Sequence, residues 1–254
     1  MAANVPLQPI DVRGWRAGLA SLVRKELREW WTTNTWWRQL LIWLILLNGV
    51  WALVLFTRPP EVRQGPGVEI FTFLSGIFAP LGVIILLGGT IATEKVSGTA
   101  AWILSKPVSR SAFVLSKLVA HSLNVLITMI VAPGLVAYLE AAAAELNLAV
   151  SSFVVGLGLL TLNLLFYVSL TVMLGTFFRS PTPVIGIATL LLFLQVGLSE
   201  AAGLGPLLPG AIPLMAPSVM LGQPLPAFFP VGAAAGLIVL FSAVAIVRFG
   251  REEF

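Results

Sequence analysis

Cysteine is absent from this sequence, and charged residues and histidine are scarce. The lack of cysteine excludes disulfide bonds, cysteine-based metal sites and a thiol nucleophile. Only 10% of the residues are charged, whereas soluble domains carry about 25%. So few charges cannot cover the water-exposed surface of a chain of 254 residues, so the composition excludes a soluble globular protein.

Long uncharged runs fill most of the chain, in which 58% of the residues are hydrophobic. A helix needs about 20 apolar residues to cross the hydrocarbon core of about 30 Å, and backbone groups in lipid must bond to one another. No alternating ten-residue pattern of a membrane barrel is present. We therefore predict one all-α transmembrane domain over residues 1–254, with six spans at roughly 37–57, 68–92, 112–139, 149–178, 182–199 and 227–247.

Two segments outside these spans have a distinct composition. Residues 1–12 contain two prolines and are predicted to be a loose tail. Residues 201–226 contain six prolines yet remain apolar. Because proline disrupts a long regular helix, we predict short broken helices there, either re-entrant or at the outer surface.

Residues 14–31 have the pattern of an amphipathic helix. Its apolar face is predicted to hold Trp15, Leu19, Leu22, Val23, Leu27 and Trp30. The residues of the opposite face are mostly basic, which is typical of a helix that lies in the membrane interface. Membrane-interface positions are predicted for Trp15, Trp30, Trp31, Trp36 and Trp37, because indole rings favour the headgroup level. The alternative is a soluble amphipathic helix that binds a partner protein.

The distribution of charge predicts the orientation of the spans. If both termini share one side with the loops near 93–117 and 179, that side carries 13 of the 15 Lys and Arg and 6 of the 11 acids, a net charge of +7. The other side carries two Arg and five Glu, a net charge of −3. Since cytoplasmic loops are rich in Lys and Arg, we predict a multi-pass protein of the inner or plasma membrane with both termini in the cytoplasm. The basic pI then reflects topology and contact with lipid, and no nucleic-acid partner is expected.

The segment between the second and third spans is unusually apolar for a cytoplasmic loop. Residues 99–105 are predicted to form a short helix that follows a break at Gly98 and is capped by Thr99. Trp102, Ile103 and Leu104 would give this helix an apolar surface able to dock on another protein. The alternative is a plain connector with Trp102 in the membrane interface.

This loop also carries a motif. It reads Glu94-x3-Gly98-Thr99, then Leu104-Ser105-x-Pro107-Val108-Ser109-Arg110, then Lys117. The motif, with the interfacial helix, the six spans and the broken helices before the last span, resembles the permeases of ABC-2 type transporters.

The resemblance implies a coupling helix near residues 94–105 that is seated on a separate ATP-binding subunit, present in two copies per complex. It also implies a second permease, either an identical copy or a paralogue. The residues implied in coupling are Glu94, Gly98, Thr99, Trp102, Ile103, Leu104, Pro107 and Arg110. The sequence has no Gly-x4-Gly-Lys-[Ser/Thr] phosphate loop, so ATP and magnesium are expected on the partner. No enzymatic activity, metal or cofactor is expected on this chain.

A few polar residues fall inside the predicted spans: Asn48, His121, Asn124, Asn163 and Gln195. Such residues either line a transport pathway or form hydrogen bonds between helices, and we favour the second role. The Gly232-x3-Gly236 pattern permits close helix contact, either between two chains or inside one bundle.

The largely uncharged spans favour export of an amphiphilic, lipid-like or drug-like cargo. One alternative is a subunit that transmits mechanical work to an extracytoplasmic partner without cargo of its own, with residues 201–226 as the contact. Another is an intramembrane hydrolase, which the single histidine and the lack of an acidic cluster disfavour.

The predicted topology can be tested with single cysteines, because the parent chain has none. An impermeant thiol reagent applied to intact cells is expected to modify Gln64→Cys and to leave Gly98→Cys unmodified, since the +7 side faces the cytoplasm. Modification at position 98 without modification at position 64 would reverse the orientation.

Overall fold

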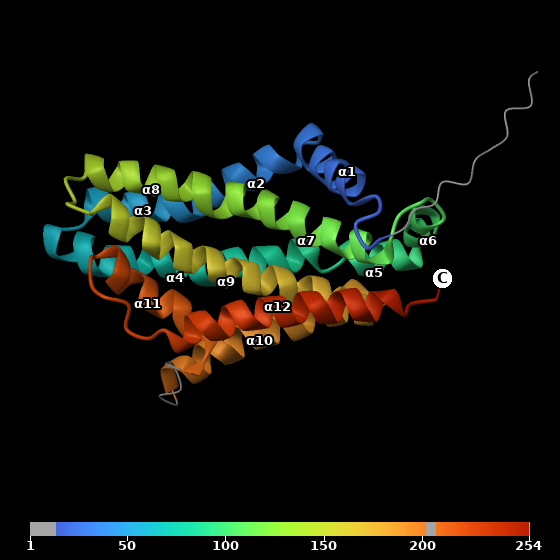
Figure 1. Ribbon diagram of the computed structural model, residues 1–254. Helices are drawn as coiled ribbons and strands as arrows, with labels where there is room; N and C mark the ends of the chain where they lie inside the picture. Colours follow the sequence, from blue (N-terminus) through green and yellow to red (C-terminus); the bar gives the residue numbers. More distant parts are fainter. Residues whose placement is uncertain (1–13, 202–206, 254) are drawn as a thin grey trace, which may run out of the picture.

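Six long helical runs lie side by side in the computed structural model, which describes residues 14–201 and 207–253 (Figure 1). These runs are long and apolar enough to cross a membrane, and the described residues contain no strand, so the predicted all-α class is confirmed. The runs cover Thr35–Thr57, Glu61–Val96, Arg110–Ala143, Val150–Phe177, Pro181–Ser199 and Phe229–Gly250. Each of the six predicted spans coincides with one of these runs, except that 149–178 and 227–247 extend beyond theirs by one or two residues. The predicted tail, residues 1–12, lies outside the described residues.

Three of the runs are interrupted helices. The first comprises α2 (Thr35–Trp43), a π-helical segment η1 (Leu44–Gly49) and α3 (Val50–Thr57). The second comprises α4 (Pro60–Leu87) and α5 (Thr90–Val96). The third comprises α7 (Arg110–Leu126), a second π-helical segment η2 (Ile127–Val131) and α8 (Ala132–Ala143). The remaining runs are α9 (Val150–Phe177), α10 (Pro181–Ala201) and α12 (Phe229–Gly250).

The second and third runs are longer than a bilayer core. They contain 36 and 34 residues, which is about 50 Å at 1.5 Å per residue, against a core of about 30 Å. Part of each run must therefore protrude. Glu94 and Lys95 stand at the end of the second run and Lys117 near the start of the third. The opposite end is charged as well, with Glu61, Arg63 and Glu69 in the second run and Glu140 in the third. Because charged groups avoid hydrocarbon, these runs protrude at both ends, and the end of α5 and the start of α7 lie outside the hydrocarbon core.

Helix α9 lies at the centre of the bundle and packs against α4, α7, α10 and α12. It has no charged residue over its 28 positions, and most of the side chains in its second half are buried. Its Asn163 donates a hydrogen bond to the carbonyl of Gly76 on α4 at 2.9 Å. This contact confirms that Asn163 links two helices.

The proline-rich segment before the last run folds back into the bundle. It contains a short 3-10 turn, η4 (Pro209–Ala211), and the helix α11 (Ile212–Met220), and its residues 202–206 lie outside the described part. Helix α11 packs against α4 and α9, and Ile212, Ala216 and Met220 are fully buried. The prediction of short broken helices is thus confirmed, and the burial favours the re-entrant alternative.

The two π-helical segments lie where Asn48 links the first run to the third. Asn48 in η1 donates to the carbonyl of Pro133, directly after η2, at 2.9 Å, and to Glu140 Oε2 at 3.3 Å. Trp51 Nε1 donates to the carbonyl of Ala137 at 3.1 Å. Asn48 is therefore confirmed as an inter-helix contact.

The two ends of the bundle differ in what they carry (Figure 1). The C-terminus lies at the same end as α5 and α6 (Thr99–Leu104), and the helix α1 (Leu19–Thr32) lies across the bundle near that end. The junction of α3 and α4 and the end of α8 lie at the other.

Close approach of α11 to α4 depends on Gly76. A Cβ atom at this position would lie 2.3 Å from Cβ of Pro213, and the proline ring cannot move away easily. We expect Gly76→Ala to destabilise the protein by about 1–3 kcal/mol through overpacking, measured by tryptophan-fluorescence melting in detergent.

Gly158→Ala on α9 is the matched control, because a Cβ there meets nothing within 4 Å. Alanine favours the helix, so this variant should melt at the parental temperature or above. Equal melting of the two variants would contradict the packing of α11 against α4.

Candidate functional site

The corner between α5 and α6 depends on a glycine. Gly98 has φ +75°, in the left-handed region that favours glycine, and α6 begins at the next residue. A Cβ at Gly98 would meet nothing within 4 Å, so the requirement is one of backbone angle rather than space. The predicted cap at Thr99 is wrong: Thr99 is the first helical residue, the cap position is Gly98, and no side chain caps the helix.

The three consecutive apolar residues of α6 have different environments. Trp102 is 62% exposed, and Lys106 Nζ lies 3.5 Å from the centroid of its ring. Ile103 is only 5% exposed because it packs into the core of the chain, and Leu104 is half-buried beside it. The prediction that all three present one apolar surface is therefore wrong, and only Trp102 is available to a partner. Pro107 is exposed and follows the end of α6 by three residues.

Glu94, at the end of α5, belongs to a cluster of charges that joins three helices. Lys117 Nζ on α7 lies 2.7 Å from Glu94 Oε1 and 3.0 Å from Glu26 Oε1 on α1. Lys25 Nζ lies 3.2 Å from Glu26 and 4.0 Å from Glu94. We call these four residues the Lys117 cluster. Glu94 thus pairs with basic groups of the chain itself.

Within the Lys117 cluster, attraction between opposite charges favours the charged forms of Glu26 and Lys25. Burial alone would raise the pKa of Glu26, but the ammonium groups of Lys117 and Lys25 outweigh it, so the pKa lies below its usual value. Burial alone would lower the pKa of Lys25, but the carboxylates of Glu26, Glu94 and Glu29 outweigh it and raise the pKa. A buried charge survives only when it is paired in this way.

A second cluster joins the neighbouring residue Lys95 to the C-terminal segment. Lys95 Nζ is buried and lies 3.1 Å from Glu252 Oε1, and it also donates to the carbonyl of Thr176 on α9 at 2.9 Å. Glu252 Oε2 accepts from Arg248 at 2.9 Å, and Arg179 lies 3.9 Å from Oε1. Although burial opposes it, hydrogen bonds and attraction from Lys95 and Arg248 lower the pKa of Glu252.

The loop after α6 is tied to both ends of the chain as well. Ser109 donates from its backbone to the carbonyl of Ala17 at 3.0 Å and from its hydroxyl to the carbonyl of Trp15 at 2.6 Å. Arg110 donates to the carbonyl of Gly250 at 2.8 Å. The segment that carries α6 is therefore connected at both its ends to α1 and to the C-terminal part of the chain.

The remaining polar residues have mixed outcomes. Asn124 accepts a hydrogen bond from Trp31 Nε1 at 3.0 Å, which confirms an inter-helix contact. The hydrogen bond predicted for His121 is wrong: neither ring nitrogen has a partner among the described residues, and Nε2 lies 3.8 Å from Glu26. The prediction also fails for Gln195, whose buried Oε1 has no partner in the described part and whose Cβ packs against Gly210.

The predicted interfacial tryptophans separate into two groups. Trp15, Trp31 and Trp37 are exposed, and Trp36 is half-buried beside Trp31. Trp30 is buried against the bundle, because it shares a face of α1 with Leu22 and Glu26. Trp30 is therefore a packing residue.

Sequence reasoning missed the partners within the two clusters. Glu26 stands four residues from both Leu22 and Trp30, and a charge on an apolar face was the available signal. The sequence contained no comparable signal for Glu252, because its partner Lys95 is remote in sequence. Among the described residues, no group of three His, Asp or Glu is placed to hold a metal ion.

Comparison with known proteins gives a match at the level of the family. A family described as "Protein of unknown function (DUF2705)" matches residues 41–254. No curated protein matches the chain.

Lys117 is the residue on which the first cluster depends. We expect Lys117→Met to destabilise the protein by about 3–5 kcal/mol, because it removes the buried ammonium group between Glu26 and Glu94 and leaves only the more exposed Lys25 beside the two carboxylates. Glu29→Gln is the control: Glu29 is exposed, and within the described part of the chain it pairs only with Lys25 at 3.9 Å, so its loss should stay within about 0.5 kcal/mol. Melting in detergent measures both. A Lys117→Met variant as stable as Glu29→Gln would show that the cluster is not buried as described.

Proposed function

This chain belongs to the DUF2705 family of proteins of unknown function, and we propose that it is the membrane-spanning permease subunit of an ATP-binding-cassette transporter. The proposal joins the motif of residues 94–117, which resembles ABC-2 type permeases, to the arrangement of charges and helices around α6. In it, α1 is the interfacial elbow helix and α6 the coupling helix.

The observation that carries the proposal is the exposure of Trp102 on a short helix beyond the end of the second span. An exposed tryptophan at the charged end of the bundle is a typical anchor for a partner protein. Ile103 and Ala100 hold α6 to the chain from the other side, so the anchor sits on a supported helix rather than on a free loop. The partner would be an ATP-binding subunit in two copies, which binds ATP and magnesium.

The two charge clusters suggest how movement of α6 reaches the spans. Glu94 and Lys95 are neighbours in sequence, yet one pairs with α1 and α7 and the other with the C-terminal segment and α9. A displacement of α6 by the ATP-binding subunits would therefore pull on both ends of the chain at once. This arrangement is useful to a permease, which turns closure of its ATPase partners into helix movement.

A second permease copy or paralogue has an open face to bind. A Cβ atom added at Gly232 or Gly236 on α12 would meet nothing within 4 Å, so no close helix contact inside the described part of the chain requires this pair of glycines. The small residues of such a pair allow two helices to approach closely in lipid.

The burial of α11 favours cargo transport over purely mechanical work on an outer partner. Most of its side chains pack on α4 and α9, so the described part of this segment offers little surface for such a partner. The cargo we propose is amphiphilic and exported, with the α6 end in the cytoplasm of the inner or plasma membrane.

The proposal predicts distinct defects around α6. Trp102→Ala should weaken binding to the proposed ATP-binding subunit by about 30-fold, the loss of an anchor worth about 2 kcal/mol. Glu94→Ala and Gly98→Val should bind more nearly normally but lose the stimulation of ATPase activity by cargo in nanodiscs, because the first breaks the Lys117 cluster and the second opposes the left-handed corner.

Phe228→Ala is the matched control for Trp102→Ala. Phe228 is also exposed and aromatic, but it lies directly before the first residue of α12, at the end of that helix opposite the C-terminus. Parental binding and coupling in the Trp102→Ala, Glu94→Ala and Gly98→Val variants would reduce this segment to a connector and remove the main support for the permease proposal.

A further inference from the structure

The helix α1 carries four different stripes of residues at four-residue spacing. One stripe, formed by Leu22, Glu26 and Trp30, is buried against the bundle. A polar stripe, formed by Ser21, Lys25 and Glu29, lies on one side of it. The other two stripes are an apolar one and a basic one, and they lie next to each other.

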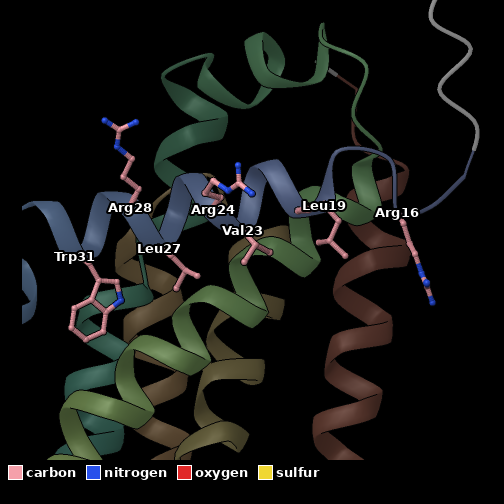
Figure 2. A pocket seen from close by; sticks show the side chains of 8 residues that line it. Arg16, Leu19, Val23, Arg24, Leu27, Arg28 and Trp31 are labelled. Atoms are coloured by element: carbon pink, nitrogen blue, oxygen red, sulfur yellow. The ribbon is translucent and has the colours of Figure 1, made fainter.

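The apolar stripe and the basic stripe together line a groove. The groove is shallow and open to the surroundings, because all of its lining residues come from this helix and the turn before it. The apolar stripe holds Leu19, Val23, Leu27 and Trp31, which are only partly covered by the chain. In Figure 2, Leu27 and Trp31 point to the side of α1 on which the spans lie. The next helix, α2, continues an apolar exposed surface with Trp37, Leu41 and Ile42.

The basic stripe holds Arg16, Arg24 and Arg28. Figure 2 shows Arg24 and Arg28 projecting from α1 on the side away from Leu27 and Trp31. Among the described residues, no carboxylate lies within ion-pair distance of these three arginines, since the acids of α1 belong to other stripes and pair with Lys25 and Lys117. The groove thus has an apolar side and a purely cationic rim.

We propose that this groove binds an anionic phospholipid, with its phosphate held by Arg24 and Arg28 and an acyl chain along Leu19, Val23, Leu27 and Trp31. Arg24 and Arg28 are one helical turn apart, so both guanidinium groups can reach one phosphate, whose oxygens match the planar donor fork of arginine. The apolar stripe favours a lipid over a soluble phosphate, because a soluble phosphate would leave these apolar side chains uncovered. The inference rests on membrane insertion and not on the proposed transport function.

The experiment compares lipids retained by the purified full chain in native mass spectrometry. The protein is exchanged in detergent against dioleoyl phosphatidylglycerol or dioleoyl phosphatidylcholine. We expect the parent to retain phosphatidylglycerol preferentially. A double R24Q/R28Q variant should bind it about 25-fold more weakly, because each basic residue near an anionic surface contributes about fivefold.

Two further variants keep the result interpretable. R24K/R28K keeps both charges and should retain a preference for phosphatidylglycerol. R58Q/R63Q removes two arginines at the junction of α3 and α4, at the other end of the bundle, and should bind phosphatidylglycerol like the parent.

Three outcomes would overturn the proposal. The first is that the parent retains both lipids equally. The second is that the R24Q/R28Q variant melts at the parental temperature and retains phosphatidylglycerol fully. The third is that soluble glycerol phosphate displaces bound phosphatidylglycerol as effectively as added phosphatidylglycerol does. The last outcome would mark a phosphate site without a lipid component. Addition of about 1 M salt should weaken the parental preference, because screening acts on exposed arginines.

Discussion

The ammonium group of Lys117, shared between the carboxylates of Glu26 and Glu94, is the contact on which the arrangement of the charged end depends. Transfer of these groups out of water costs several kcal/mol for each charge, and attraction at 2.7 and 3.0 Å offsets that cost only while all three are present. Because they come from α1, α5 and α7, the position of α1 on the bundle and the direction of α5 are fixed together. The direction of α5 in turn sets where Gly98 turns the chain and where Trp102 is displayed.

Lys95 gives the same helix a second attachment on its other side, through Glu252 and the carbonyl of Thr176. Two adjacent residues of opposite charge thus link α5 to segments from the beginning and the end of the chain. Apolar packing alone orients helices weakly in lipid, since hydrocarbon tails solvate leucine as well as another helix does. Paired charges in the protruding part supply the directional contacts that the apolar spans lack.

Composition and run length were sufficient to predict the six spans, because the thickness of the bilayer imposes a length that uncharged runs record directly. Gly98 was also predictable, since few other residues accept a positive φ. One apolar surface on α6 was a wrong prediction that the helical period alone could have corrected, because successive helical residues point about 100° apart and Trp102, Ile103 and Leu104 cannot share one face. Which of the three is exposed depends on packing against the rest of the bundle and was not predictable. The pairing of Lys117 with Glu26 and of Lys95 with Glu252 joins residues that are far apart in sequence, and periodicity within one helix holds no information on it.

The two π-helical segments set the rotational register of the spans that contain them. A π-helical turn accommodates about one residue more than an α-helical turn, and each residue advances an α-helix by about 100°. All of α3 is thus turned by roughly a quarter of a circle from where an uninterrupted α-helix would place it, and so is all of α8. Deleting one residue from η1 would carry Trp51 and Leu55 from the protein interior toward lipid and would shorten the span by only one residue. In this chain the number of apolar residues sets the length of a span, and the π-helical segments set which face of the span packs on the bundle.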